Sequence, residues 1–187
     1  MLVTGLDTET TGLRQEDGHR IVEIGLLTYE LETQQLVDRY VTRINPERAI
    51  DADAQRVHGI SNDMVLHCPK WEEVASDVEH ELMKSDLIVI HNAKFDAPFV
   101  TAELERVGIT LPATLPALDT LNARWATFDG KSPKLGELCR ALGVPYDADA
   151  AHAAEYDIDR MMQCFFRGHA RGFFPLDRVH PFAYWPR

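Results

Sequence analysis

The sequence predicts an α/β domain in which one mixed β-sheet is covered by helices. Three segments rich in β-branched and aromatic residues lie within the first 45 residues and predict an antiparallel meander. A later run, residues 87–90, is continuously apolar, as expected of a central parallel strand buried on both faces. Amphipathic segments with helical spacing follow these strands, and this order is typical of a sheet with helices packed against it.

The first half of the chain supplies the meander and one helix. The expected strands are 2–6, 21–29 and 36–44. Gly5 lies inside the first strand, although a buried strand prefers a more apolar residue. Behind Pro69, apolar residues recur with helical spacing and predict an amphipathic helix: Trp71, Val74, Ala75, Val78 and Leu82.

The middle of the chain alternates strands with helices. After the strand at 87–90, we expect a helix that opens near Phe95. Pro98 should lie in the first turn of this helix, where a missing N–H is tolerated. A short strand or turn is then expected at 115–118.

Two helices and a tail complete the chain. The first helix should have Ser132 as N-cap, Pro133 at its first position and Gly143 just past its end. The second should end near Gly168. The aromatic tail, 169–187, could cover the core, form a dimer contact or bind a partner, and the sequence leaves these alternatives open.

Length and composition predict one domain. The chain has 187 residues, 45% of them hydrophobic, which suffices for one compact core. No apolar stretch reaches the roughly 18 residues of a membrane span, and the N-terminus lacks a basic signal-like region. We therefore expect a soluble, cytoplasmic protein without membrane contact. The three cysteines are far apart in sequence, fit neither a disulfide framework nor a close metal-ligand pair, and should be reduced.

The net charge of −11 argues against an extended nucleic-acid surface, because such surfaces neutralise phosphates with Lys and Arg. Acids clustered around divalent cations would reverse the local charge, so that only a short strand end need be bound. An ordinary acidic surface that favours solubility is the other explanation.

Asp7 and Glu9 stand at the end of the first predicted strand. They are two residues apart, so the alternation of a strand can direct both carboxylates to one side. Taken alone, they could be an acidic strand end before the turn at Thr10-Thr11-Gly12. Together with further acids, they predict a metal site.

Asn92 and Asp96 directly follow the second buried strand. Side chains at the carboxyl end of such a strand project into the crevice where α/β sheets bind ligands. Asp96 is therefore the third candidate acid, although an acid at a helix start also suits the helix dipole. Asn92 would equally suit a turn.

His152 and Asp157 form the last candidate pair. Five residues at about 100° each place them about 140° apart on a helix, so they cannot act together from one regular helix. We expect Asp157 to be held on the last helix and His152 to come from the loop or frayed end before it.

The combination of four acids and one histidine predicts a reaction class. Four acids close together repel one another, and divalent cations are the simplest way to relieve this repulsion. Oxygen ligands favour Mg²⁺ or Mn²⁺, and two ions about 4 Å apart can stabilise both reacting oxygens of a phosphodiester. A neutral His152 could accept the proton of the attacking water. The predicted reaction is metal-assisted phosphodiester hydrolysis.

Five motifs occur in an order that resembles a known enzyme family. They are Asp7-Thr8-Glu9-Thr10-Thr11-Gly12, Ile21-Val22-Glu23-Ile24-Gly25, Val57-His58-Gly59-Ile60, His91-Asn92-Ala93-Lys94-Phe95-Asp96, and His152 followed after four residues by Asp157. Over about residues 2–168, the chain resembles the DEDDh exonucleases, the family of the proofreading epsilon subunit of bacterial DNA polymerase III, RNase T and oligoribonuclease. The resemblance implies an RNase H-like fold with a five-stranded mixed sheet, in a domain that spans 1–168.

The resemblance also implies roles for individual residues. Two Mg²⁺ or Mn²⁺ ions would be held by Asp7, Glu9, Asp96 and Asp157, with His152 as the general base. The residues expected to contact the terminal nucleotide or shape its site are Thr10, Thr11, Gly12, Leu13, Val57, His58, Ile60 and Asn92. Asp119 matches an acid common in this family, and we expect it to be structural, as a helix cap.

The predicted substrate is a single-stranded or frayed DNA 3′ end, degraded in the 3′–5′ direction during proofreading, repair or replication. A DNA polymerase or another replication protein would then be the partner. Hydrolysis of RNA ends is the first alternative, because contacts to the 2′-OH decide the matter and short motifs do not reveal them. A non-catalytic nucleic-acid or polymerase-binding module is an alternative of another class, and the retained acids and histidine argue against it.

Four basic residues are candidate phosphate contacts, and each could equally be an ordinary solvated residue: Lys94, Arg124, Lys131 and Lys134. The sequence does not decide between a monomer and a homodimer.

Overall fold

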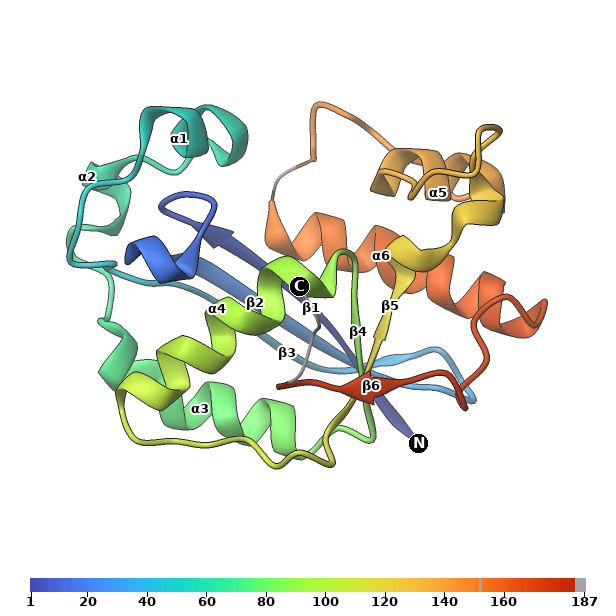
Figure 1. Ribbon diagram of the computed structural model, residues 1–187, viewed down its shortest axis with the longest axis horizontal. Coiled ribbons are helices and arrows are strands. Elements are labelled where there is room, and N and C mark those ends of the chain that lie inside the picture. The colour runs from blue at the N-terminus through green and yellow to red at the C-terminus, as the bar shows by residue number, and fades with distance from the viewer. Residues whose placement is uncertain (152, 184–187) are drawn as a thin grey trace.

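The framework of the protein is a mixed β-sheet with helices packed against it (Figure 1). The computed structural model describes residues 1–151 and 153–183. Within these residues the sheet has six strands in the order β3-β2-β1-β4-β5-β6. The strands are β1 Leu2–Thr10, β2 Ile21–Glu30, β3 Leu36–Arg43, β4 Leu87–Ile90, β5 Pro116–Asp119 and β6 His180–Pro181.

The pairing of the strands confirms the predicted mixture. Strands β1, β2 and β3 form the antiparallel meander, and β4 and β5 extend β1 as parallel strands. The expected count of five strands was wrong, because β6 pairs antiparallel with β5. This edge strand has only two residues, too few to show an alternating pattern in the sequence.

The helices cover both faces of the sheet. They are α1 Ala52–His58, α2 Asn62–Val65, α3 Trp71–Met83, α4 Ala93–Arg106, α5 Leu135–Leu142 and α6 Ala154–Ala170. Short 3-10 helices are η1 Gln15–Asp17, η2 Thr120–Asn122 and η3 Arg124–Ala126. Helices α3 and α4 pack into one core cluster, and α5 and α6 pack into another (Figure 1).

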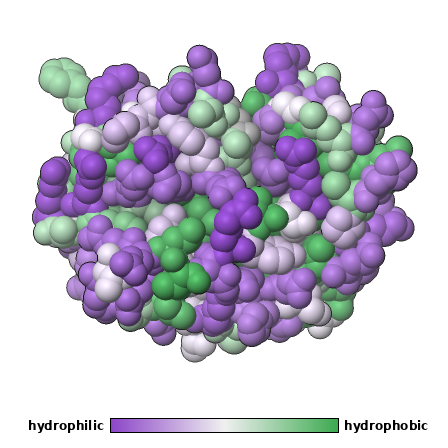
Figure 2. All heavy atoms as spheres, turned by 180° about the vertical axis from the view of Figure 1, so that it is seen from behind, coloured by the Kyte–Doolittle hydropathy of each residue, from purple (hydrophilic) through white to green (hydrophobic). Residues whose placement is uncertain are grey.

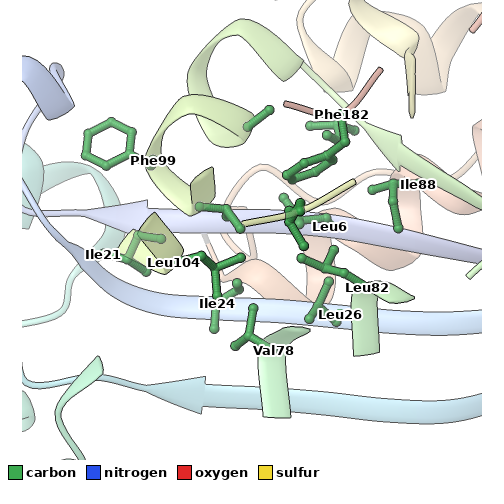
Figure 3. Packing of buried hydrophobic residues seen from close by; sticks show 14 of the residues in the cluster. Leu6, Ile21, Ile24, Leu26, Val78, Leu82, Ile88, Phe99, Leu104 and Phe182 are labelled. Carbon is green, nitrogen blue, oxygen red and sulfur yellow. The ribbon is translucent and has the colours of Figure 1, made fainter. Parts of the chain in front are cut away.

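Alternation along the central strands fills the two clusters. Leu6 and Ile88 point into the cluster with Val78 of α3, as Figure 3 shows. Val3 and Val89 belong to the cluster on the opposite face, with α5 and α6. The apolar run 87–90 is therefore buried on both faces, as predicted for a central parallel strand.

Helix α4 begins earlier than the sequence indicated. It starts at Ala93, so Pro98 lies in its second turn, and the expectation of a first-turn proline was wrong. The early start has a tertiary cause, because the Asp119 carboxylate accepts hydrogen bonds from the N–H groups of Asn92 and Ala93. Asn92 takes a left-handed conformation (φ 82°) that turns the chain into the helix.

Two other helix ends also differ from expectation. Helix α5 has Lys134 as N-cap instead of Ser132, and the Glu137 carboxylate accepts the Lys134 N–H at 2.7 Å. Its predicted end is confirmed, since Gly143 is the left-handed C-cap. Helix α6 runs two residues beyond Gly168, to Ala170. A division of the chain at residue 168 stays a prediction.

The C-terminal segment contributes aromatic residues to both clusters. Phe174 is buried against α6, and Phe182 is buried in the cluster of α3 and α4 (Figure 3). Phe173 is partly exposed and stacks on Trp125, with ring centroids 4.2 Å apart. Residues 184–187 of the predicted tail lie outside the described residues.

The face of the molecule behind the view of Figure 1 is largely polar. Figure 2 shows the face behind the view of Figure 1, where hydrophilic side chains predominate and hydrophobic ones form small groups between them. None of the helices in the described ranges is both long and apolar enough to cross a bilayer. The thiols of Cys68, Cys139 and Cys164 are free, as expected.

Candidate active site

The carboxyl-terminal half of β1 presents two acids on one side of the sheet. Val3 faces α6, and the period of two along the strand places Asp7 and Glu9 on the same side. Oxygens from Asp7, Glu9 and Asp157, one from each carboxylate, all lie within 4.8 Å of one another. The predicted strand pair and the predicted helix acid are therefore brought together.

Two glycines set how closely α6 approaches the sheet. A Cβ added to Gly5 would lie 2.6 Å from Cγ2 of Ile158, and one added to Gly25 would lie 2.6 Å from its Cδ1. Asp157 is the chain neighbour of Ile158 in the first turn of α6, so this approach carries its carboxylate to the two acids of β1. The glycine that seemed unsuited to a buried strand is required by the packing.

Asp96 comes from α4 and is held by Thr8. The Thr8 N–H donates to Oδ1 of Asp96 at 3.0 Å, and the Thr8 hydroxyl donates to the same oxygen at 2.6 Å. Because Thr8 lies between Asp7 and Glu9, these bonds tie the fourth acid to the strand that carries the first two.

Asp119 acts on the site indirectly, by capping. Its Oδ1 accepts the N–H of Asn92 at 2.9 Å and that of Leu121 at 2.8 Å, and its Oδ2 accepts the N–H of Ala93 at 3.1 Å. The expected helix cap is thus confirmed, and one carboxylate orders the starts of both η2 and α4. Since α4 carries Asp96, this cap also positions a site acid.

Burial and mutual repulsion make the ionised forms of these acids unfavourable. Burial, followed by the charges of Asp96, Glu9 and Asp157, raises the pKa of Asp7 well above its usual range. Burial and the charges of Asp157 and Asp96 raise the pKa of Glu9 to about 9. Burial raises the pKa of Asp96 to about 7, although the two hydrogen bonds from Thr8 oppose this rise.

The donor set fits a hard divalent cation. All the converging atoms are carboxylate oxygens, which Mg²⁺ and Mn²⁺ prefer. A bound cation would offset both the cost of burying these charges and their repulsion. Asp7, Glu9 and Asp157 could therefore hold a metal ion, with Asp96 beside them.

A pocket of about 610 Å³ opens over the four acids. Of the residues predicted to contact substrate, Leu13 and Asn92 line it. Lys134, a predicted phosphate contact, lines it as well. Sequence reasoning missed other members of the wall, which include His91, Phe95, Pro133, Leu135, Tyr146 and Met161.

Tyr146 is a member of the wall with a recognisable signal. A Cβ on Gly136 would lie 2.8 Å from Cε1 of the Tyr146 ring, so the glycine leaves room for the ring against α5. Glycine inside a helix costs about 1 kcal/mol relative to alanine. Gly136 within a predicted helix could thus have indicated a close contact at this point.

The turn after β1 is held mainly from inside the protein. The Thr10 hydroxyl donates to the carbonyl of Gly12 at 2.7 Å, and the Thr11 hydroxyl oxygen accepts the N–H of Arg20 at 3.0 Å. Thr10 and Thr11 are buried, and neither they nor Gly12 is part of the pocket wall. Leu13, at the end of this turn, is 81% exposed and does reach the wall.

His58 also serves this turn. Its Nδ1 accepts the N–H of Ile60 at 3.0 Å, so Nε2 carries the proton that is directed to the Thr10 carbonyl at 3.2 Å. Ile60 is buried, Val57 is exposed, and the three residues stand outside the pocket wall. His152, the predicted general base, lies outside the described residues.

Comparison with known proteins relates the chain to nucleases. Residues 4–165 match the RNase T family model, which is described as Exonuclease. DNA polymerase III subunit epsilon of Rickettsia felis is 38% identical over 156 residues, which cover 81% of this chain and 67% of that protein. The subunit of the same name from Treponema pallidum is 35% identical over 165 residues, which cover 87% of this chain and 74% of that protein.

Solved structures share the fold at lower identity. E. coli exonuclease I in complex with a dT13 oligonucleotide aligns with a TM-score of 0.76 and 17% identity, over 91% of this chain and 41% of that chain. The nuclease domain of 3′hExo, a DEDDh family member bound to rAMP, aligns with a TM-score of 0.73 and 18% identity, over 93% of this chain and 94% of that chain. At these identities the likeness establishes a shared fold.

Proposed function

Because the chain belongs to the exonuclease family, we propose that it removes nucleotides from single-stranded or frayed DNA 3′ ends, as a proofreading enzyme does. One observation carries this proposal. Carboxylate oxygens from Asp7, Glu9 and Asp157 converge within 4.8 Å, beneath an open pocket. Such a set of acids suits phosphodiester hydrolysis with divalent cations.

We assign Asp7, Glu9, Asp96 and Asp157 as the ligands of two Mg²⁺ or Mn²⁺ ions. When bound, such ions supply a nucleophile from water at neutral pH and stabilise charge on the phosphate. The role of the protein is to hold the ligands in place, through the two Thr8 hydrogen bonds to Asp96 and the close packing of α6.

His152 is assigned as the general base that accepts the proton of the attacking water. The support is its place in the sequence, five residues before Asp157, which leaves it just ahead of α6. A neutral imidazole can take up this proton.

The pocket would receive the terminal nucleotide. Leu13 and Asn92 line it and could contact the nucleotide directly. The other residues that the family resemblance suggested stay proposed contacts of the nucleotide: Thr10, Thr11, Gly12, Val57, His58 and Ile60. Thr10 and His58 also shape the turn that carries Leu13, through the carbonyls of Gly12 and Thr10. Val57 and Ile60 flank the His58-Gly59 pair on either side.

A DNA substrate and a polymerase partner are supported by the relatives. The two described above are named as epsilon subunits of DNA polymerase III, and the structure of exonuclease I contains a dT13 oligonucleotide. We therefore propose that this chain works on DNA beside a replicative polymerase.

The test is a time course with 5′-labelled single-stranded DNA and a matching RNA, each with Mg²⁺, Mn²⁺ or EDTA. We expect a ladder that shortens from the 3′ end, needs metal and forms faster on DNA. Asp7→Asn should abolish it, while Asp63→Asn, an exposed acid far along the chain, should not. Faster hydrolysis of RNA would refute the DNA assignment, and an active Asp7→Asn enzyme would refute the site.

A further inference from the structure

A fully exposed aromatic residue stands in the loop that leads to the pocket. Phe128 has a relative exposure of 110%, whereas Trp125, nearby in the chain, is 42% exposed and stacked on Phe173. Phenylalanine is usually buried, and this solvated ring leaves its aromatic faces free to contact a ligand.

The turn that carries Phe128 is held by its own hydrogen bonds. The Thr127 hydroxyl donates to the carbonyl of Lys131 at 2.6 Å. The Lys131 N–H donates to Oδ1 of Asp129 at 3.2 Å, and Gly130 takes a left-handed conformation (φ 70°). This closed turn, residues 127–131, holds the ring of Phe128 in the solvent without contact with the core.

The turn is continuous with the wall of the pocket. Immediately after it, residues 132–136 line the pocket over the four acids. Ser132, Pro133 and Lys134 precede α5, and Lys134 has an extended backbone, with φ −68° and ψ 158°. A nucleic-acid single strand that leaves the pocket on this side would meet the turn, which lies within a few residues of the pocket wall.

Positive charge accompanies the exposed ring. Between residues 124 and 140 the sequence has four cations and two acids, although the whole chain carries −11. Arg124, Lys134 and Arg140 are exposed, and they form no ion pair with any residue in the described ranges. Elsewhere many cations are paired with acids, as Arg43 is with Glu23. The positive charge of these residues, which are near Phe128 in the sequence, is therefore available to an anionic ligand.

We propose that the segment 124–134 binds the single strand on the 5′ side of the nucleotide that is removed. A base stacks on Phe128, and phosphates lie beside Arg124 and Lys134. Stacking on an aromatic ring tolerates any base, and cations follow the backbone, which is the combination that single-strand binding requires. This inference rests on the proposed function, and it explains how an acidic protein could hold a polyanion near its site.

The test compares substrates that reach the segment with substrates that do not. Phe128→Ala should lower kcat/KM for a single-stranded oligonucleotide of about ten nucleotides at least about five-fold more than for a dinucleotide, mainly through KM. Phe128→Trp should restore most of the loss. Arg124→Gln should lower the slope of log KM against log salt concentration, by an amount that corresponds to about one phosphate contact. Leu36→Ala, an exposed apolar residue on β3, is the matched control and should change neither substrate.

Binding measured without turnover separates this inference from the proposed function. In the Asp7→Asn background, fluorescence anisotropy with a labelled oligo-dT should show a weaker Kd when Phe128 is replaced by alanine. A weaker Kd would support the inference even if the wild-type protein hydrolysed nothing. An unchanged Kd for the Phe128→Ala variant would overturn the inference, and would suit a ring that contacts another protein. An equal loss of kcat/KM on the dinucleotide and the oligonucleotide would also overturn it.

Discussion

The cap formed by Asp119 allows a quantitative prediction. Asp119→Ala removes the acceptor for three N–H groups, those of Asn92, Ala93 and Leu121. Replacing a helix cap by alanine costs about 0.5–2 kcal/mol, and this side chain serves two helix starts. Asp119 is 8% exposed, so water cannot easily replace the lost acceptor. We expect the free energy of unfolding to fall by about 2–4 kcal/mol.

Asp119→Asn is the matched variant. Its side-chain oxygen can still accept the N–H groups of Asn92 and Leu121, which both bond to Oδ1. Only the bond from Ala93 to Oδ2 is lost, because an amide NH₂ cannot accept it. We expect a loss of about 1–2 kcal/mol, roughly half of that in the alanine variant.

Urea unfolding followed by circular dichroism would measure both losses, with Asp63→Ala as an exposed control that should stay within about 0.5 kcal/mol of the wild type. The exonuclease rate of the folded Asp119→Ala protein should also fall, because α4 carries Asp96. Equal losses for the asparagine and alanine variants, or a loss below about 1 kcal/mol for alanine, would refute the hydrogen-bond reasoning.

Further predictions concern packing and charge. Gly5→Ala places a Cβ 2.6 Å from Cγ2 of Ile158 and 2.8 Å from Cγ of Met162. The free energy of unfolding should fall by about 1–3 kcal/mol, and the exonuclease rate should fall because α6 must move away from the sheet. An unchanged urea midpoint would contradict this. In EDTA, the Tm should fall as pH rises. Folding raises the pKa of Asp96 from 3.8 to about 7 and that of Glu9 from 4.5 to about 9. Between these values the folded state therefore binds more protons than the unfolded state, and its stability falls as the pH rises. Stability from protonated Asp96 and Glu9 is thus complete at about pH 4 and lost by about pH 9, and Mg²⁺ should oppose the loss at the upper end; a Tm that rises across this range would show that the acids do not repel one another as described.

Local patterns in the sequence determined most of the secondary structure. The meander, the run 87–90 and the helix that starts at Trp71 depend on periodicity within each segment, which is visible without knowledge of the fold. The acids Asp7 and Glu9 were also predictable as a pair, because the alternation of a strand places them on one side whatever packs there.

Tertiary contacts decided the features that local patterns could not reveal. Helix α4 starts at Ala93 because Asp119, far along the chain, accepts N–H groups there. The two-residue strand β6 exists only as an addition to the edge of β5. Gly5 looked unfavourable until α6 was seen to pack upon it.

The same division holds for the site. The sequence by itself determined which residue types are present and the side of β1 to which its two acids point. Three features came only from the tertiary structure: the convergence of Asp7, Glu9 and Asp157 oxygens within 4.8 Å, the bonds from Thr8 to Asp96, and the place of Tyr146 in the wall. The physical reason is that periodicity reports the neighbours of a residue along its own element, whereas these contacts join elements whose separation depends on how every side chain between them packs.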